Sequence, residues 1–165
     1  MIADSWDIAH IAVVVSDLER AMEEYSQGLG IEWAPSFDMP SDLRSGSDVH
    51  EGGVSFEGLS AVLPLTQVGP ARMELIHTVP GSPASLVWGC PDGHDYVHHI
   101  AYYVEDIDAE SAHLVAQGWE REWFVDPEGP LRMAYHRLAN RLRVELVDIA
   151  VKSEMADRRK SVLAR

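Results

Sequence analysis

Several features that mark whole classes of protein are scarce or missing in this 165-residue sequence. It has one cysteine, Cys90, which excludes an internal disulfide and fits a reducing compartment. No apolar run approaches the ~18 residues that cross a membrane. The first residues lack the basic and apolar regions of a secretion signal. We therefore expect a cytoplasmic protein with no membrane partner.

Basic residues are also scarce. The chain has 13 Lys and Arg against 27 Asp and Glu, which gives a formal net charge of −14 at pH 7. A body this acidic repels phosphate backbones, so nucleic acid is not an expected partner. The exception is the basic tail at 151–165, which we interpret as a solvated, frayed end.

The sequence does contain an internal repeat. Residues 10–18 read HIAVVVSDL, and residues 99–107 read HIAYYVEDI. Each block is followed by a stretch with helical spacing of apolar residues that ends at a glycine. Each copy then closes on a similar segment, RMELI at 72–76 and RVELV at 143–147. A repeat of this kind decides the fold prediction.

Each copy predicts one strand, one helix and three further strands. Asp17 is a good N-cap for the first helix, and the second is expected over 106–117. Residues 35–53 are rich in Pro, Ser, Asp and Gly and predict an extended loop, with turns at 68–71 and 127–130. The expected strands are 8–15, 31–34, 54–57 or 61–66, and 72–79 in the first copy, and 99–104, 119–124, 131–138 and 142–149 in the second.

These elements predict an α+β protein made of two tandem βαβββ modules. The expected organisation is a first module at 1–80, a linker at 81–97, a second module at 98–150 and a basic C-terminal tail at 151–165. Two such modules leave sheet edges that need covering, so a homodimer is expected.

The repeat duplicates two residue types that bind metals. His10 and His99 open equivalent strands, and Glu74 and Glu145 lie in equivalent closing strands. If the two modules pack as pseudo-twofold partners, two imidazoles and two carboxylates can converge on one point. Such a neutral N/O set suits one divalent transition metal: Ni, Co, Zn, Mn or Fe.

A structural explanation exists for each of these residues alone. A single His at the start of a strand is commonly half-buried, and a single Glu in an apolar strand commonly pairs with a nearby Arg, for which Arg72 and Arg143 are both available. The recurrence of all four residues at matched places favours metal binding, because a cation compensates two buried carboxylates at once.

The motifs resemble those of the vicinal oxygen chelate superfamily, which includes glyoxalase I, methylmalonyl-CoA epimerases, extradiol dioxygenases and bleomycin or fosfomycin resistance proteins. The resemblance extends from Ile8 to Asp148. It is carried by His10 with Asp17 and Leu18, the segment Glu74 to Ile76, the doublet His98-His99 with Asp106 and Ile107, and the segment Glu145 to Val147. The His/Glu/His/Glu set is similar to that of bacterial glyoxalase I, whereas the His doublet is closer to epimerases.

The resemblance implies a cup-shaped mixed sheet with the metal in the cup, held by His10, Glu74, His99 and Glu145. It also implies a lyase or isomerase that stabilises the enolate of a small carbonyl or acyl-thioester substrate. Glu145 and Glu57 are the candidate catalytic residues, with Glu74 as a further candidate base and Glu51 near Glu57 in the same region. Two alternatives are a non-catalytic module that binds a small molecule and a non-haem iron dioxygenase.

Two further histidines lie in the strands of the second copy. His98 alternates with His99 along the strand and should point away from the metal ligands, in a supporting or structural role. His136, next to Tyr135, is considered as a side chain lining the cup, although a strand His without a repeated counterpart is more often structural.

Overall fold

The computed structural model describes residues 6–41, 43, 45–65, 72–125, 132–139 and 142–153. By contacts it divides into two compact units. We call Met1–Ala9, Arg44–Val54 and His99–Arg165 the C-terminal unit, and His10–Leu43 and Ser55–His98 the N-terminal unit. Two of the unit boundaries fall within strands, in β1 (Asp7–Val14) and in β6 (Tyr96–Val104). The module bounds expected from the sequence stay a prediction.

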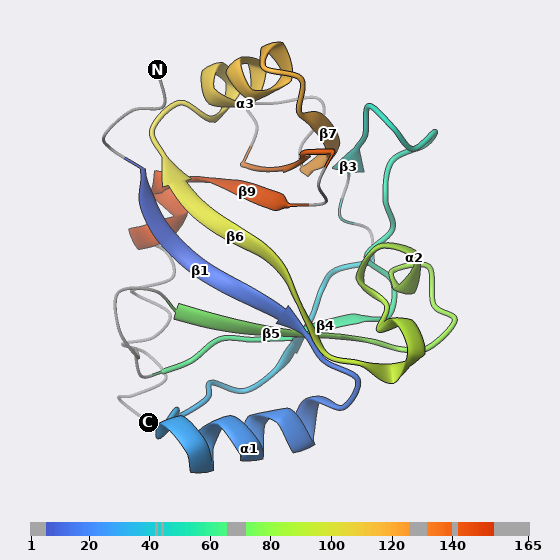
Figure 1. The fold of residues 1–165 in the computed structure, drawn as a ribbon, viewed down its shortest axis with the longest axis vertical. Coiled ribbons are helices and arrows are strands. Elements are labelled where there is room, and N and C mark those ends of the chain that lie inside the picture. The colour runs from blue at the N-terminus through green and yellow to red at the C-terminus, as the bar shows by residue number, and fades with distance from the viewer. Residues whose placement is uncertain are drawn as a thin grey trace. The chain divides into compact units, whose positions relative to one another are not determined.

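The N-terminal unit contains a mixed sheet in the order β2-β4-β5-β1. β1 runs parallel to β5 (Arg72–Thr78), β5 pairs antiparallel with β4 (Leu59–Val62), and β4 pairs antiparallel with β2 (Phe37–Asp38). Helix α1 (Leu18–Leu29) follows β1 in the chain (Figure 1) and precedes β2. Along the chain, the elements of this unit run β1, α1, β2, β4 and β5, which is the predicted order of one strand, one helix and three strands.

Helix α1 begins and ends where its sequence predicts. The Asp17 side chain accepts a hydrogen bond from the Arg20 backbone N–H at 3.0 Å, and Gly30 ends the helix in the left-handed region at φ 70°. Its buried face packs on the sheet in one apolar cluster of Val13, Val15, Ala21, Val62 and Leu75. Since Leu75 faces the helix, its neighbour Glu74 faces the other side of the sheet.

The C-terminal unit repeats this plan in the order β6-β9-β8-β7-β3. β6 runs parallel to β9 (Arg143–Asp148), which pairs antiparallel with β8 (Met133–Arg137), and β8 pairs antiparallel with β7 (Glu120–Val125). Helix α3 (Ile107–Ala116) is capped by Asp106 and packs on Val144 and Leu146 of β9. Glu145 therefore faces away from the helix, as Glu74 does in the other unit.

The structure differs from the predicted elements in three places. The expected strand at 31–34 is reduced to one bridge between Trp33 and Pro64. The expected loop at 35–53 contains β2 and also β3 (Ser45–Gly46), which pairs with the edge of β7 inside the C-terminal unit. The expected linker holds α2 (Ser85–Trp88) and a 3₁₀ turn, η1 (Pro91–Gly93). Short apolar or Pro- and Gly-rich stretches carry too little periodicity to predict such elements.

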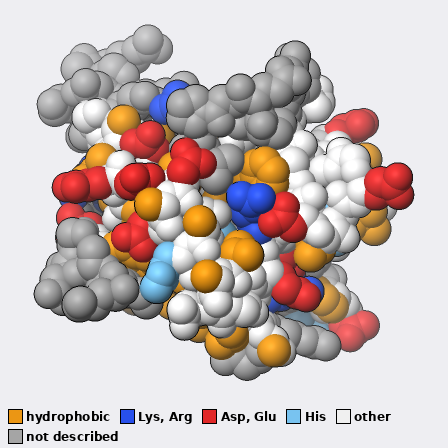
Figure 2. All heavy atoms as spheres, turned by 90° about the horizontal axis from the view of Figure 1, so that it is seen from above, with side chains coloured by type: hydrophobic (Ala, Val, Ile, Leu, Met, Phe, Trp, Pro, Cys, Tyr) orange, Lys and Arg blue, Asp and Glu red, His pale blue; other side chains and the backbone are white. Residues whose placement is uncertain are grey.

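Residues 149–153 are helical and follow β9 directly. The rest of the basic tail, together with the turns expected at 68–71 and 127–130, lies outside the described residues. None of the helices in the described part of the chain is long and apolar enough to cross a membrane. Figure 2 shows one face of the molecule, on which Asp and Glu side chains are spread among fewer Lys and Arg.

Candidate functional site

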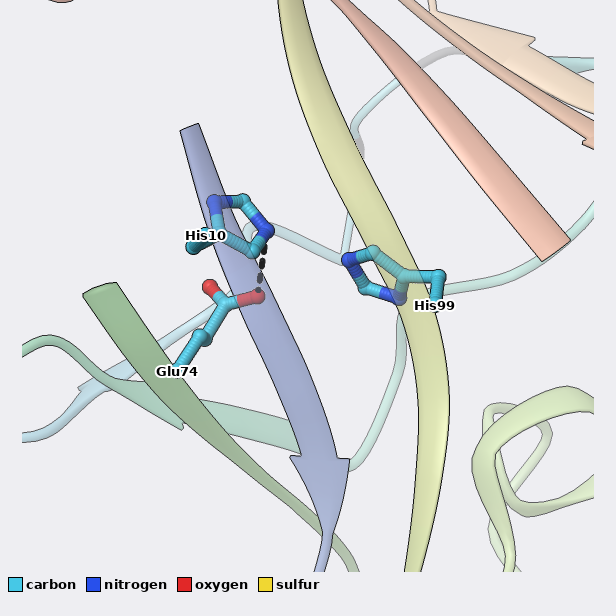
Figure 3. A group of neighbouring side chains, drawn as sticks. All are labelled: His10, Glu74 and His99. Carbon is cyan, nitrogen blue, oxygen red and sulfur yellow. Dashed lines mark ion pairs between the residues drawn. The ribbon is translucent and has the colours of Figure 1, made fainter. Parts of the chain in front are cut away.

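The N-terminal unit brings His10 and Glu74 into contact. His10 lies on β1 and Glu74 on the adjacent parallel strand β5, where His10 is in register with Arg72 and Ala12 with Glu74. The His10 Nε2 and Glu74 Oε2 atoms are 3.2 Å apart, and both side chains are 14% exposed (Figure 3). The two residues predicted as ligands from the first copy thus form a half-buried pair.

The C-terminal unit builds the same pair from equivalent strands. His99 of β6 lies beside Glu145 of β9, and the His99 Nε2 and Glu145 Oε2 atoms are also 3.2 Å apart. This pair is fully buried, with side chains 0% and 1% exposed. Burying an ionised carboxylate is costly unless an opposite charge lies close by. The second copy thus repeats the His–Glu contact of the first copy, but with both side chains buried from solvent.

Arg72 and Arg143 do not form ion pairs with Glu74 and Glu145. Arg143, two residues before Glu145, donates hydrogen bonds to both carboxylate oxygens of Glu122, at 2.7 and 3.1 Å. Glu122 also pairs with Arg137 at 3.1 Å. Glu74 lies in ion-pair contact with His10 and forms no such contact with Arg72. The explanation of these glutamates as ion pairs with Arg72 and Arg143 therefore does not apply.

Both pairs have the chemistry and spacing of neighbouring metal ligands. Two ligand atoms that are each about 2.1 Å from an ion lie roughly 3.0–3.4 Å apart in octahedral or tetrahedral geometry. The 3.2 Å separation within each pair falls in this range. The donors are imidazole nitrogens and carboxylate oxygens, which suit divalent transition metals. The residues present in each unit therefore fit the type of ion that the resemblance implies.

An aromatic stack supports the buried pair. Tyr135 of β8 is in register with Glu145 of β9, and its ring stacks on Trp123 with centroids 3.8 Å apart. The Tyr135 hydroxyl lies 3.3 Å from His99 Nε2. From the sequence, Tyr135 is named only as the neighbour of His136, and Trp123 is predicted only together with the other Trp residues, as core or cup wall. The signal that could have found Tyr135 is the antiparallel register of β8 and β9, which the sequence alone does not fix.

His98 and His136 point away from the ligand face. His98 is buried against Trp88, with ring centroids 6.3 Å apart. His136 lies beneath α3, where its Nε2 is 2.9 Å from the Ser111 hydroxyl. The suggestion that His136 lines the cup is therefore wrong, because it alternates with Tyr135 along β8 and faces the helix. Burial, and then the charge of Arg121, lower the pKa of His136 to about 4.

The other candidate bases lie on the surface of the molecule. Glu57 is exposed in a turn directly before β4, and Glu51 is exposed in an earlier turn. The backbone of the Glu57 turn is ordered by hydrogen bonds from Ala84 N to Glu57 O and from Glu57 N to the Ser55 hydroxyl. The catalytic role of Glu57 stays a prediction.

Comparisons with known proteins agree with this geometry. The family model described as "Glyoxalase/Bleomycin resistance protein/Dioxygenase superfamily" matches residues 9–139. No curated protein sequence matches the chain significantly.

Solved structures show the same fold at low identity. Methylmalonyl-CoA epimerase from Mycobacterium tuberculosis is 20% identical with a TM-score of 0.61, over 90% of this chain and 92% of that one. A hypothetical protein from Bacillus halodurans is 17% identical (TM-score 0.59, 88% and 95% covered). A methylmalonyl-CoA epimerase in complex with methylmalonyl-CoA is 19% identical (TM-score 0.57, 87% and 94% covered). The predicted α+β fold of paired βαβββ modules is confirmed, and the chain belongs to the glyoxalase/bleomycin resistance protein/dioxygenase superfamily.

Proposed function

We propose that this chain is a metal-dependent lyase or isomerase of the glyoxalase or epimerase type. Its site would consist of His10, Glu74, His99 and Glu145 around one divalent transition metal. The observation that carries the proposal is the duplication: each unit presents one His and one Glu from equivalent parallel strands, at the same 3.2 Å separation. A single His–Glu contact is common, but the same contact in both copies points to a shared task.

The proposed substrate is a small carbonyl compound or an acyl-thioester. A bound divalent metal ion supplies a Lewis acid for the substrate oxygen and so favours the negative charge that develops there. A carboxylate of this chain then removes the proton from the adjacent carbon and returns it, with Glu145, Glu74 and Glu57 as the candidate bases. The half-buried His10 and Glu74 keep part of their surface open to solvent, whereas His99 and Glu145 do not.

The similar structures support the acyl-thioester over other carbonyl compounds. Several are methylmalonyl-CoA epimerases, and one is a complex with methylmalonyl-CoA. Their identity to this chain is at most 20%, so they support the fold directly and the substrate only by analogy. We also propose that the protein acts in the cytoplasm as a homodimer.

Proton exchange tests this function. Purified protein in D₂O should exchange the hydrogen next to the carbonyl of a 2-oxo acid or an acyl-thioester, because the proposed base removes and returns that proton. NMR follows the loss of the proton signal, and protein treated with a chelator is the control. Tight binding without exchange would replace the enzyme with a binding module, and consumption of O₂ by an iron-loaded sample would replace it with a dioxygenase.

A further inference from the structure

One cation lies beside the candidate site on the ligand face of the N-terminal unit. Arg72 begins β5 two residues before Glu74, and its Cα is in register with His10 on β1. Residues i and i+2 of a strand share a face, so Arg72 and Glu74 share theirs. Neighbouring strands lie about 5 Å apart. A group held by Arg72 therefore lies within a few bonds of a group held by His10 and Glu74.

Arg72 differs in its charge environment from five other described cations. It is half-buried, and no acidic side chain lies within ion-pair distance of it among the residues that the structure describes. The six residues before it, TQVGPA, contain no carboxylate. Described cations that do have an acidic partner are Arg20, Arg121, Arg137, Arg143 and Lys152.

The internal repeat sharpens this contrast. Arg143 holds the position in β9 that Arg72 holds in β5, two residues before the candidate ligand. Arg143 forms a bidentate ion pair with the buried Glu122. In the first copy the arginine is present, and none of the described residues supplies it with a carboxylate. A guanidinium group can donate two parallel hydrogen bonds to one carboxylate. A carboxylate is therefore the group that we expect Arg72 to bind.

We propose that Arg72 binds a free carboxylate of the substrate, on a carbon close to the carbonyl oxygen held by the metal site. The substrate class is then a short 2-oxo acid or an acyl-thioester that carries its own carboxylate, rather than a neutral aldehyde or ketone. This inference rests on the proposed function for the position of the carbonyl group. The preference for a substrate with a carboxylate is assigned to Arg72 and not to the metal site.

Pyruvate and its amide, pyruvamide, test the assignment, because they share the 2-oxo group and only pyruvate carries a carboxylate. Calorimetry on the full-length protein as purified should show pyruvate binding about tenfold more tightly than pyruvamide, as expected for one charge-assisted pair. Arg72→Met should remove this preference and leave the metal content unchanged. Arg72→Lys should keep part of the preference, and the control Arg20→Met, on the exposed end of α1, should keep all of it.

The outcomes separate this proposal from the metal site. If wild type holds metal but does not prefer pyruvate over pyruvamide, or if Arg72→Met keeps the full preference, the role of Arg72 is overturned. If wild type holds no metal and Arg72→Met still abolishes the preference, the metal site is overturned and the carboxylate site stands.

Discussion

Glu145→Gln should lower the maximal rate of proton exchange by roughly 10²–10⁴-fold, the range for losing a positioned acid or base. Glu145 is fully buried and in contact with His99, so it has a place in either proposed role, as ligand or as base. Because the interaction strengthens as negative charge develops on the substrate, the loss should appear in turnover and not only in affinity. NMR-detected exchange at saturating substrate measures this effect.

Two further variants serve as controls for the effect of Glu145→Gln. His113→Gln changes a histidine near the end of α3 that has no repeated counterpart, and it should leave turnover near the wild-type value. Glu57→Gln changes the exposed alternative base. Loss of exchange in Glu57→Gln, with Glu145→Gln still active, would transfer the proton-abstracting role to Glu57. Full activity of both would contradict a role for either residue and leave Glu74 as the remaining candidate base.

Acid should destabilise this protein through His136. The pKa of His136 is about 4 in the folded chain, and the ordinary value is 6.5, because burial and then Arg121 disfavour the protonated ring. The unfolded chain therefore binds more protons between these two values, and stability falls as the pH drops from about 6.5 to 4. The 2.5-unit difference corresponds to roughly 3 kcal/mol of unfolding free energy.

Urea unfolding at pH 7.5 and pH 4 measures this contribution by comparison between variants. His136→Gln should lose about 3 kcal/mol less than wild type over this interval, whatever its stability at pH 7.5. His94→Gln, at an exposed position, should follow the wild-type curve. Equal acid losses in wild type and His136→Gln would show that the buried ring does not resist protonation.

Much of the fold was predictable because the sequence contains an internal repeat. The apolar alternation in β5 and β9 assigned Leu75 and Leu146 to the helix side and left Glu74 and Glu145 on the other side. The cap at Asp17 followed from local chemistry in the same way. The pairing of each His with the Glu of its own copy then required only the parallel register of adjacent strands.

What the sequence did not predict depends on contacts between distant segments. β3 pairs with β7, and next to this pairing Asp48 forms an ion pair at 2.9 Å with Arg121, which is far away in the sequence. Similarly, the assignment of Glu122 to Arg143 and Arg137 depends on the irregular register between Arg121 and Trp123. Such partners are selected by three-dimensional packing, and a one-residue shift in register would exchange the faces of the strand.

The metal content of the full-length chain tests the central claim most directly. Elemental analysis of wild type should find one divalent transition-metal ion per chain, since the account assigns both His–Glu pairs to a single ion. His10→Ala and His99→Ala, which each disrupt a different pair, should both lose it. Two ions per chain, with each variant losing only one, would show two independent sites. An unchanged metal content in both variants would contradict the account.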